Sequence, residues 1–318
     1  MITGTKHIKA RISIENSMAR NKKQKISCLS VRDGISPNHI WLPEGDWSRM
    51  LDFLTHRFPD ISEERWCTRM ARGDVVDESG TIINEQTAYR TGSRLYYYRE
   101  LEMESEIPFE EIIIYQDEHI IVADKPHFLP VAPSGRYLNE TLLTRLKRKL
   151  AIDHLVPLHR LDRETAGLVM FSRNIQTRDL YHALFREHQI RKTYHALACY
   201  NARYNYPFTY RSRIIEAAEF YRRQEVAGEP NAETHINMIE KRGEIALYYL
   251  NPVSGKTHQL RVHMAALGMA ILNDPYYPDL TGWKGDDFSK PLQLLAKAIA
   301  FVDPVSGELR NFTSGRQI

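Results

Sequence analysis

Residues 156–174 read VPLHRLDRETAGLVMFSRN, and they place a dense polar cluster between two apolar runs. The cluster contains His159, Arg160, Asp162, Arg163, Glu164 and Thr165, and a strand-like apolar run follows Gly167. A carboxylate among arginines has its charged form favoured, so its pKa is lowered. Such a group suits a nucleophile or base that must be ionised at neutral pH. Taken alone, the residues also allow a salt-bridged turn at the end of a strand.

The segment HRLDRETAGLV, residues 159–169, closely resembles the H-R-L-D-x-x-T-S/A-G-L signature of the RluA/RluD-type ribosomal pseudouridine synthases. The resemblance implies that Asp162 is the catalytic residue. It also implies that Arg160 helps to hold the place of a nucleotide extruded from the RNA. The implied reaction, the isomerisation of uridine to pseudouridine, needs no cofactor and no metal. The implied fold is α+β, with a mixed, largely antiparallel sheet flanked by helices and loops.

Four further segments resemble the same family in the order that the family requires. They are IIIYQDEHIIVADKPHFLPVAPSG (112–135), RKTYHALACY (191–200), NPVSGKTHQLRVHMAALGMAILNDPYY (251–277) and LQLLAKAIAFVDPVSGE (292–308). The resemblance implies that Tyr194 stacks on the target base and that Arg261 pairs with the catalytic aspartate. It also implies RNA contacts for other residues of these motifs: His159, Arg160, Thr165, Lys192, Lys256, His258 and Leu260.

The chain departs from the family pattern at several positions: Phe128 replaces a glycine, Met269-Ala270 replaces His-Pro, and Leu295 and Asp303 each replace a histidine. Without the motifs, Tyr194 could equally be a strand core residue, and Lys256 and Arg261 could be surface charges. His258 and His263 are five residues apart without an acidic partner, which argues against a metal site. Phosphate-loop and dinucleotide-binding glycine patterns are both absent from the sequence.

Residues 41–100 are predicted to form a separate module of two short helices followed by strands. The stretch RFPDISEERWCTRMARGDVV, residues 57–76, resembles the S-four-like RNA-binding module, although Asp77-Glu78 departs from that family's turn. Arg65, Arg69 and Arg72 lie about one helical turn apart and predict a basic, RNA-binding face. A generic small α+β domain with exposed arginines is the alternative.

The remaining segments complete the predicted domain organisation. Residues 1–40 are basic and predict either a flexible, solvated extension or an arm that contacts phosphates. Residues 101–109 form an acidic linker, and residues 110–318 form the catalytic domain. A Lys/Arg-rich helix is expected over residues 141–150, where Arg145, Lys147, Arg148 and Lys149 either contact phosphates or form a solvated face.

Composition limits the setting in which the protein works. The 318 residues carry a net charge of only +3, and their three widely spaced cysteines, Cys28, Cys67 and Cys199, predict reduced thiols and a cytoplasmic location. No stretch reaches the roughly 20 apolar residues of a membrane helix. We therefore expect RNA as the partner, no membrane, no small-molecule cofactor, and a monomer as the default.

The appended module favours ribosomal RNA, and transfer RNA is the alternative. Two other functions stay open at this point. One is a catalytically silent RNA-binding or ribosome-assembly protein, and the other is a hydrolase that uses Asp162 with His159.

Overall fold

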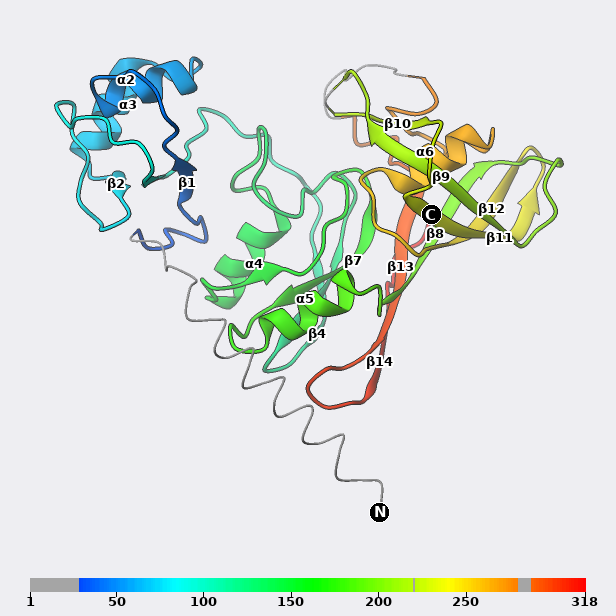
Figure 1. Ribbon diagram of the computed structural model, residues 1–318. Coiled ribbons are helices and arrows are strands. Elements are labelled where there is room, and N and C mark those ends of the chain that lie inside the picture. The colour runs from blue at the N-terminus through cyan, green and yellow to red at the C-terminus, as the bar shows by residue number, and fades with distance from the viewer. Residues whose placement is uncertain (1–28, 220, 280–286) are drawn as a thin grey trace. The chain divides into compact units, whose positions relative to one another are not determined.

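The computed structural model describes residues 29–219, 221–279 and 287–318. The chain forms two compact units, which are described separately below (Figure 1). Residues 29–104, 135–139 and 144–153 belong to the first unit, and the other described residues belong to the second. Within the described ranges, no helix combines the length and the apolar character needed to cross a bilayer.

The first unit combines short helices with a small antiparallel sheet. Its elements are β1 (Asn38–Trp41), α2 (Met50–Arg57), α3 (Glu63–Ala71), β2 (Val75–Asp77) and β3 (Arg94–Tyr97), and the strand order is β1-β3-β2. Ser62 caps α3, because its hydroxyl accepts a hydrogen bond from the Arg65 N–H at 3.3 Å. Trp66, Leu54 and Leu95 are fully buried in one core cluster. The predicted sequence of two helices and then strands is confirmed, and the likeness to the S-four-like module stays a prediction.

The predicted boundaries of this unit need correction. Residues 38–40 lie in β1, which pairs with β3, so the end of the predicted extension is part of the folded unit. Residues 1–28 of that extension lie outside the described residues. The helix α4 (Leu142–Leu150) contributes its residues from Thr144 onward to the first unit, although they follow the predicted start of the catalytic domain.

The predicted basic face of the first unit is not open. Arg69 is only 1% exposed, and its Nε donates to a Glu100 carboxylate oxygen at 3.2 Å. Arg72 pairs with Glu100 and Asp74, and Arg65 donates to Glu102 at 2.6 Å. The expectation of an RNA contact is therefore wrong for Arg69, whose charge is buried, and the other two arginines are neutralised in part by acidic partners.

The basic residues of α4 also have partners within the first unit. Lys147 is buried, and its ammonium donates to the Ser36 hydroxyl at 2.8 Å. The Arg148 guanidinium donates to the backbone carbonyl of Asp33 at 2.8 Å and pairs with the carboxylate of the same residue. These two side chains hold α4 against residues 33–36, which accounts for part of the basic character of the helix without RNA.

The second unit is built on one large sheet with the strand order β10-β9-β11-β12-β8-β13-β7-β5-β4, to which β14 and β6 add at β13 and β7. Only the pairing of β13 with β7 is parallel among the described strands, so the predicted mixed, largely antiparallel sheet is confirmed. The strands are β4 (Ile112–Gln116), β5 (Ile120–Lys125), β6 (Val156–Pro157), β7 (Ala166–Ser172), β8 (Arg191–Cys199), β9 (Phe208–Glu216), β10 (Arg223–Val226), β11 (Ala232–Arg242), β12 (Ile245–Pro252), β13 (Leu294–Val302) and β14 (Leu309–Thr313).

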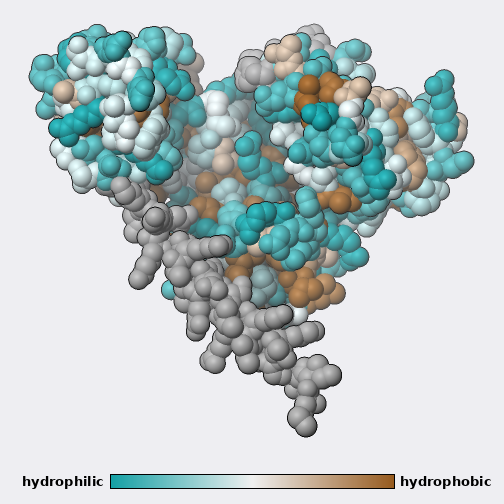
Figure 2. Space-filling view, viewed as in Figure 1, coloured by the Kyte–Doolittle hydropathy of each residue, from teal (hydrophilic) through white to brown (hydrophobic). Residues whose placement is uncertain are grey.

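Two helices pack against different parts of this sheet (Figure 1). The helix α5 (Arg178–Arg186) buries Tyr181 and Leu184 in a cluster with residues of β5 and β7. The helix α6 (Gln259–Ala266) buries Leu260 and Met264 in a cluster with residues of β8 and β12. The sheet between the two helices is therefore free to form the floor of a site. By contrast, the outer end of the β11–β12 pair is hydrophilic, where Glu240, Lys241 and Arg242 are exposed (Figure 2).

Three of the positions where the sequence departs from the family pattern, Phe128, Leu295 and Asp303, lie in well-defined surroundings. Phe128 adopts the left-handed conformation with φ +67°, which a glycine adopts more readily, and its ring is buried. Leu295 lies in β13 opposite Ala166 of β7. Asp303 is 2% exposed and accepts a hydrogen bond from the Tyr181 hydroxyl, 3.1 Å from each carboxylate oxygen.

Candidate active site

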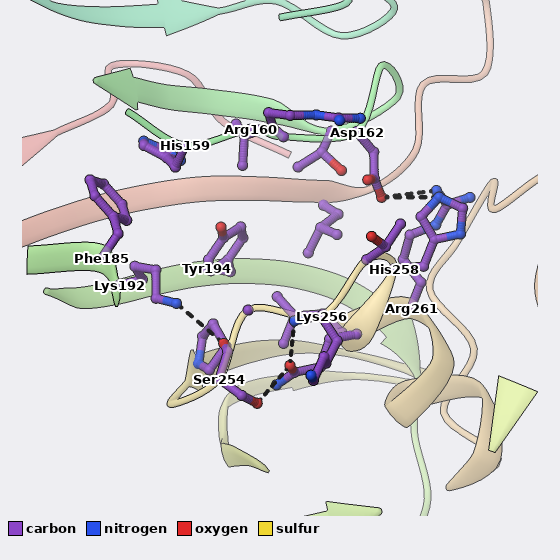
Figure 3. A pocket seen from close by; sticks show the side chains of 18 of the residues that line it. His159, Arg160, Asp162, Phe185, Lys192, Tyr194, Ser254, Lys256, His258 and Arg261 are labelled. Carbon is purple, nitrogen blue, oxygen red and sulfur yellow. Dashed lines mark hydrogen bonds and ion pairs between the residues drawn. The ribbon is translucent and has the colours of Figure 1, made fainter. Parts of the chain in front are cut away.

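A cavity of about 770 Å³ lies over β8, where the end of α5 and the segment leading into α6 form its walls (Figure 3). Its lining includes every residue predicted as catalytic or RNA-binding in the catalytic domain: Asp162, Arg261, Tyr194, His159, Arg160, Thr165, Lys192, Lys256, His258 and Leu260. Asp162 is the only carboxylate among these lining residues. The fold therefore gathers three segments that are distant in the sequence around one acid.

Asp162 lies in the loop between β6 and β7 and faces α6. Its Oδ2 accepts a hydrogen bond from Nη1 of Arg261 at 3.1 Å (Figure 3). The Arg261 side chain is 1% exposed, whereas that of Asp162 is 23% exposed. The arginine is thus fixed inside the protein, and the carboxylate opens toward the cavity.

A second carboxylate holds Arg261 in place. Asp274, whose side chain is also 1% exposed, accepts Nε of Arg261 at 2.8 Å and Nη2 at 2.6 Å. This two-point geometry matches the planar guanidinium to a carboxylate and leaves Nη1 directed at Asp162. Asp274 is a site residue that was not predicted from the sequence, and the signal that could have identified it is its place in the NDPYY segment, residues 273–277.

Charges around Asp162 favour its ionised form. Burial by itself raises the pKa of this carboxyl, but His258 and Arg261 outweigh burial and bring the pKa below its usual value. Burial lowers the pKa of His258, so the imidazole is neutral near pH 7, and Arg261 provides the permanent positive charge. Asp162 is consequently ready to act as a base or nucleophile at neutral pH.

His258 faces the same carboxylate oxygen from the N-cap position of α6. Its Nε2 lies 3.7 Å from Asp162 Oδ2, and its Nδ1 lies 3.0 Å from the Tyr277 hydroxyl. The Tyr277 hydroxyl oxygen also accepts the Arg223 backbone N–H at 2.7 Å. The imidazole is thus held at Nδ1, and its Nε2 faces Asp162.

Tyr194 lies in β8 and lines the cavity floor beside Asp162 (Figure 3). Burial and the nearby negative charge of Asp162 both raise the pKa of its hydroxyl, so the phenol stays protonated. Lys192 lies two residues earlier on the same face of the strand, and its ammonium donates to the Ser254 carbonyl at 3.2 Å. An uncharged aromatic ring at this position can stack on a nucleobase.

His159 has a structural role in the cavity wall. Its ring stacks on Phe185 with centroids 4.6 Å apart, and its Nε2 accepts the Met170 backbone N–H at 3.0 Å. Burial lowers the pKa of His159 to about 3, so the ring is a neutral acceptor. A hydrolase that uses His159 as the base partner of Asp162 is therefore disfavoured, because the acceptor nitrogen is already engaged.

Lys125 supports the catalytic loop from inside the protein. Its ammonium donates to the backbone carbonyls of Pro126, Leu129 and Arg163 at 2.9, 2.8 and 3.1 Å. Burial lowers the pKa of this ammonium to about 7. Lys125 lies in one of the family-like segments, but no function was predicted for it from the sequence. The structure shows that it connects β5 to the residue after Asp162.

Comparisons with known proteins identify the family. The family described as RNA pseudouridylate synthase matches residues 119–266. The tRNA pseudouridine synthase C of Yersinia pestis is 30% identical over 64% of this chain and 85% of its own length. The chain belongs to the RNA pseudouridine synthase family. It is accordingly an isomerase that acts on uridine in RNA.

Other relatives agree with this assignment. An uncharacterized RNA pseudouridine synthase of Synechocystis is 29% identical over 72% of this chain and 79% of its own length. The solved structure of human RNA pseudouridylate synthase domain containing 1 aligns with a TM-score of 0.55 and 21% identity. That alignment covers 67% of this chain and 86% of the human one, and it supports the α+β fold.

Proposed function

We propose that this pseudouridine synthase modifies structured ribosomal RNA and that Asp162 is its essential carboxylate. The observation that carries the catalytic part is the pair formed by Asp162 and the buried guanidinium of Arg261, in a cavity where the described lining residues include no other carboxylate. The appended first unit supports a large folded RNA as the substrate. The cytoplasm is the proposed location and the monomer the proposed state.

The target uridine enters the cavity as an everted nucleotide. Extruding a base from a helix costs a few kcal/mol. Stacking of the uracil on the Tyr194 ring contributes on the order of 1–3 kcal/mol and offsets part of that cost. Arg160 is exposed at the cavity and has no ion-pair partner among the described residues, so its planar guanidinium can fill the gap left in the RNA stack.

Asp162 acts on the nucleotide without a redox partner. In the reaction the bond between the sugar and uracil N1 breaks, the uracil turns, and a bond from the sugar to C5 forms while C5 loses its proton. The ionised Asp162 begins this sequence either by covalent attack or by removing a sugar proton to give a glycal. Arg261 stabilises the carboxylate in both routes, and Lys256 and His258 lie beside the entering nucleotide.

Release of tritium from uracil C5 tests the catalytic proposal. Ribosomal RNA labelled at C5 is prepared from cells that lack the gene and incubated with the enzyme. We expect the wild type to release label and Asp162→Asn to be slower by on the order of 10⁴-fold or more. The variant should still bind the RNA, because the amide has the shape of the carboxylate. Label release at the wild-type rate by this variant would remove Asp162 from the mechanism.

Transfer RNA is the second candidate substrate. It is favoured by the names of two relatives, the Yersinia tRNA pseudouridine synthase C and a yeast mitochondrial tRNA pseudouridine(32) synthase. Pseudouridine maps of ribosomal and transfer RNA, from cells with and without the gene, separate the candidates. A site lost only from transfer RNA would refute the ribosomal proposal.

A further inference from the structure

A second cavity of about 720 Å³ lies on the other face of β8. Thr193 lines this cavity, whereas the adjacent Tyr194 lines the catalytic cavity, and neighbouring residues of a strand point to opposite faces of the sheet. His188 and Lys192 line both cavities. The two cavities therefore meet at the beginning of β8.

The charge of the second cavity favours an anionic ligand. None of its described lining residues is acidic, and the lining contains Arg191, Lys192, His188 and His235. Arg191 is exposed and forms no ion pair within the described part of the chain. The nearby Glu233 is held by Arg211 at 2.8 Å, with His235 3.8 Å away, so its charge is largely balanced.

The floor of the cavity provides a ring and polar groups that suit a nucleobase. Tyr249 is 37% exposed, and its hydroxyl accepts a hydrogen bond from the Thr193 hydroxyl at 3.2 Å. The Asn251 side-chain amide donates to the Lys192 carbonyl at 2.9 Å and to the Thr193 hydroxyl at 3.0 Å. The small side chains of Ala298 and Ala300 leave space above β13. The cavity thus combines a fixed aromatic face with an uncrowded surface.

We propose that this cavity binds a nucleotide of the same RNA strand, next to the target uridine. The strand passes from the catalytic cavity over His188 and Lys192, its phosphate pairs with Arg191, and a flanking base stacks on Tyr249. The inference rests on the proposed function, since it requires the uridine to occupy the cavity beside Asp162. It adds a second point of recognition and makes affinity depend on the nucleotides around the target.

Binding of a labelled oligouridylate 12-mer and of uridine 5′-monophosphate tests this path. The measurements use Asp162→Asn as the background so that no turnover occurs. Adding Tyr249→Ala or Arg191→Ala should weaken 12-mer binding about tenfold. Binding of the mononucleotide, which can fill only the catalytic cavity, should not change. Tyr249→Phe keeps the ring and should bind the 12-mer like the background protein.

Arg203→Ala serves as the matched control, because Arg203 is also exposed but lies beyond the other end of β8. Equal melting temperatures show that each variant is folded. Unchanged 12-mer affinity in both Tyr249→Ala and Arg191→Ala overturns the inference. An equal loss for the 12-mer and the mononucleotide also overturns it, because the effect would then lie in the catalytic cavity. Tritium release by the enzyme with Asp162 intact tests the proposed function separately, so each proposal can fail alone.

Discussion

The side chain of His258 ends a hydrogen-bond chain that begins at the Arg223 backbone N–H and passes through the Tyr277 hydroxyl. This chain fixes the orientation of the imidazole, whose Nε2 lies 3.7 Å from Asp162 Oδ2. Other charged groups also act on this centre: Arg261 and Lys125 on the carboxylate, and Arg261, Glu164 and Asp274 on the imidazole. When it is protonated, His258 lowers the pKa of Asp162 through its charge, and replacing it removes that contribution.

Replacing His258 by Phe should move the acid limb of the kcat/KM profile to higher pH. The nearby imidazole favours the ionised form of Asp162 through its charge, so its loss raises the pKa of this carboxyl, and the fraction of active enzyme falls at a higher pH. We expect kcat to drop roughly tenfold, which corresponds to about 1.4 kcal/mol of lost stabilisation. His258→Gln supplies an amide N–H, and it should restore part of kcat and part of the position of the acid limb. An acid limb identical in His258→Phe and wild type would exclude this role.

The sequence could identify Asp162, Tyr194, His258 and Arg261 as candidates because each lies in an ordered motif. It could not show how they are oriented. The two-point pairing of Arg261 with Asp274 and the orientation of His258 both depend on groups from α6, β10 and the loop after α6. These contacts form only when the elements pack together, so the sequence motif around each residue does not predict its hydrogen-bond partners.

At the scale of elements, the parallel pairing of β7 with β13 positions the start of β7. This strand follows the loop that carries Asp162. Gly167 pairs with Ala296, and its φ of +113° lies in a region that residues with a side chain rarely adopt. A Cβ at this position would lie 2.3 Å from the Ala296 carbonyl oxygen and 2.7 Å from its backbone nitrogen. Both neighbours are backbone atoms of a buried strand, so they cannot move aside cheaply.

Gly167→Ala should therefore lower the free energy of unfolding by about 3 kcal/mol or more, from steric overlap added to backbone strain. Urea denaturation followed by circular dichroism measures the change. Gly315→Ala is the matched control, because a Cβ there would meet no atom within 4 Å, and it should differ from wild type by less than about 0.5 kcal/mol. Equal stability of the two variants would contradict the close approach of β7 and β13.

Element positions were predicted well where the pattern was local and poorly where partners were distant. The apolar spacing and the N-cap residue Ser62 correctly predicted the helices α2 and α3, and the apolar runs correctly predicted the strands β4 and β5. The predicted basic face failed because Glu100 and Glu102 come from the end of the module and the acidic segment after it. Helical spacing alone cannot show that an acidic segment further along the chain returns to α3.

At the scale of the whole molecule, stability should depend on pH through histidines that stay neutral in the fold. Burial lowers the pKa of His263 to about 4, that of His127 to about 4 and that of His159 to about 3. In the unfolded chain a histidine titrates near 6.5. Below that pH the unfolded state binds protons that the folded state does not, so stability falls as the pH falls from about 6.5 toward 4.

His263 provides the sharpest test, because it is fully buried and bonded only through hydroxyls, to Ser212 at 3.1 Å and Thr234 at 3.0 Å. A single histidine shifted from about 6.5 to about 4 makes unfolding easier by about 2 kcal/mol between pH 7 and pH 5. We expect His263→Gln, which keeps polar contacts to both hydroxyls but cannot titrate, to lose about 2 kcal/mol less than wild type over this interval.

Urea denaturation at pH 7, 6 and 5 measures the two slopes. The lowered pKa of Lys125, about 7, affects both proteins alike and cancels in the difference. Asp162 does not interfere, because a carboxyl whose folded pKa is depressed keeps its full contribution above the unfolded value near 4 and loses it only at lower pH. Parallel pH dependence in wild type and His263→Gln would mean that His263 takes up a proton inside the fold, which its two hydroxyl partners and complete burial argue against.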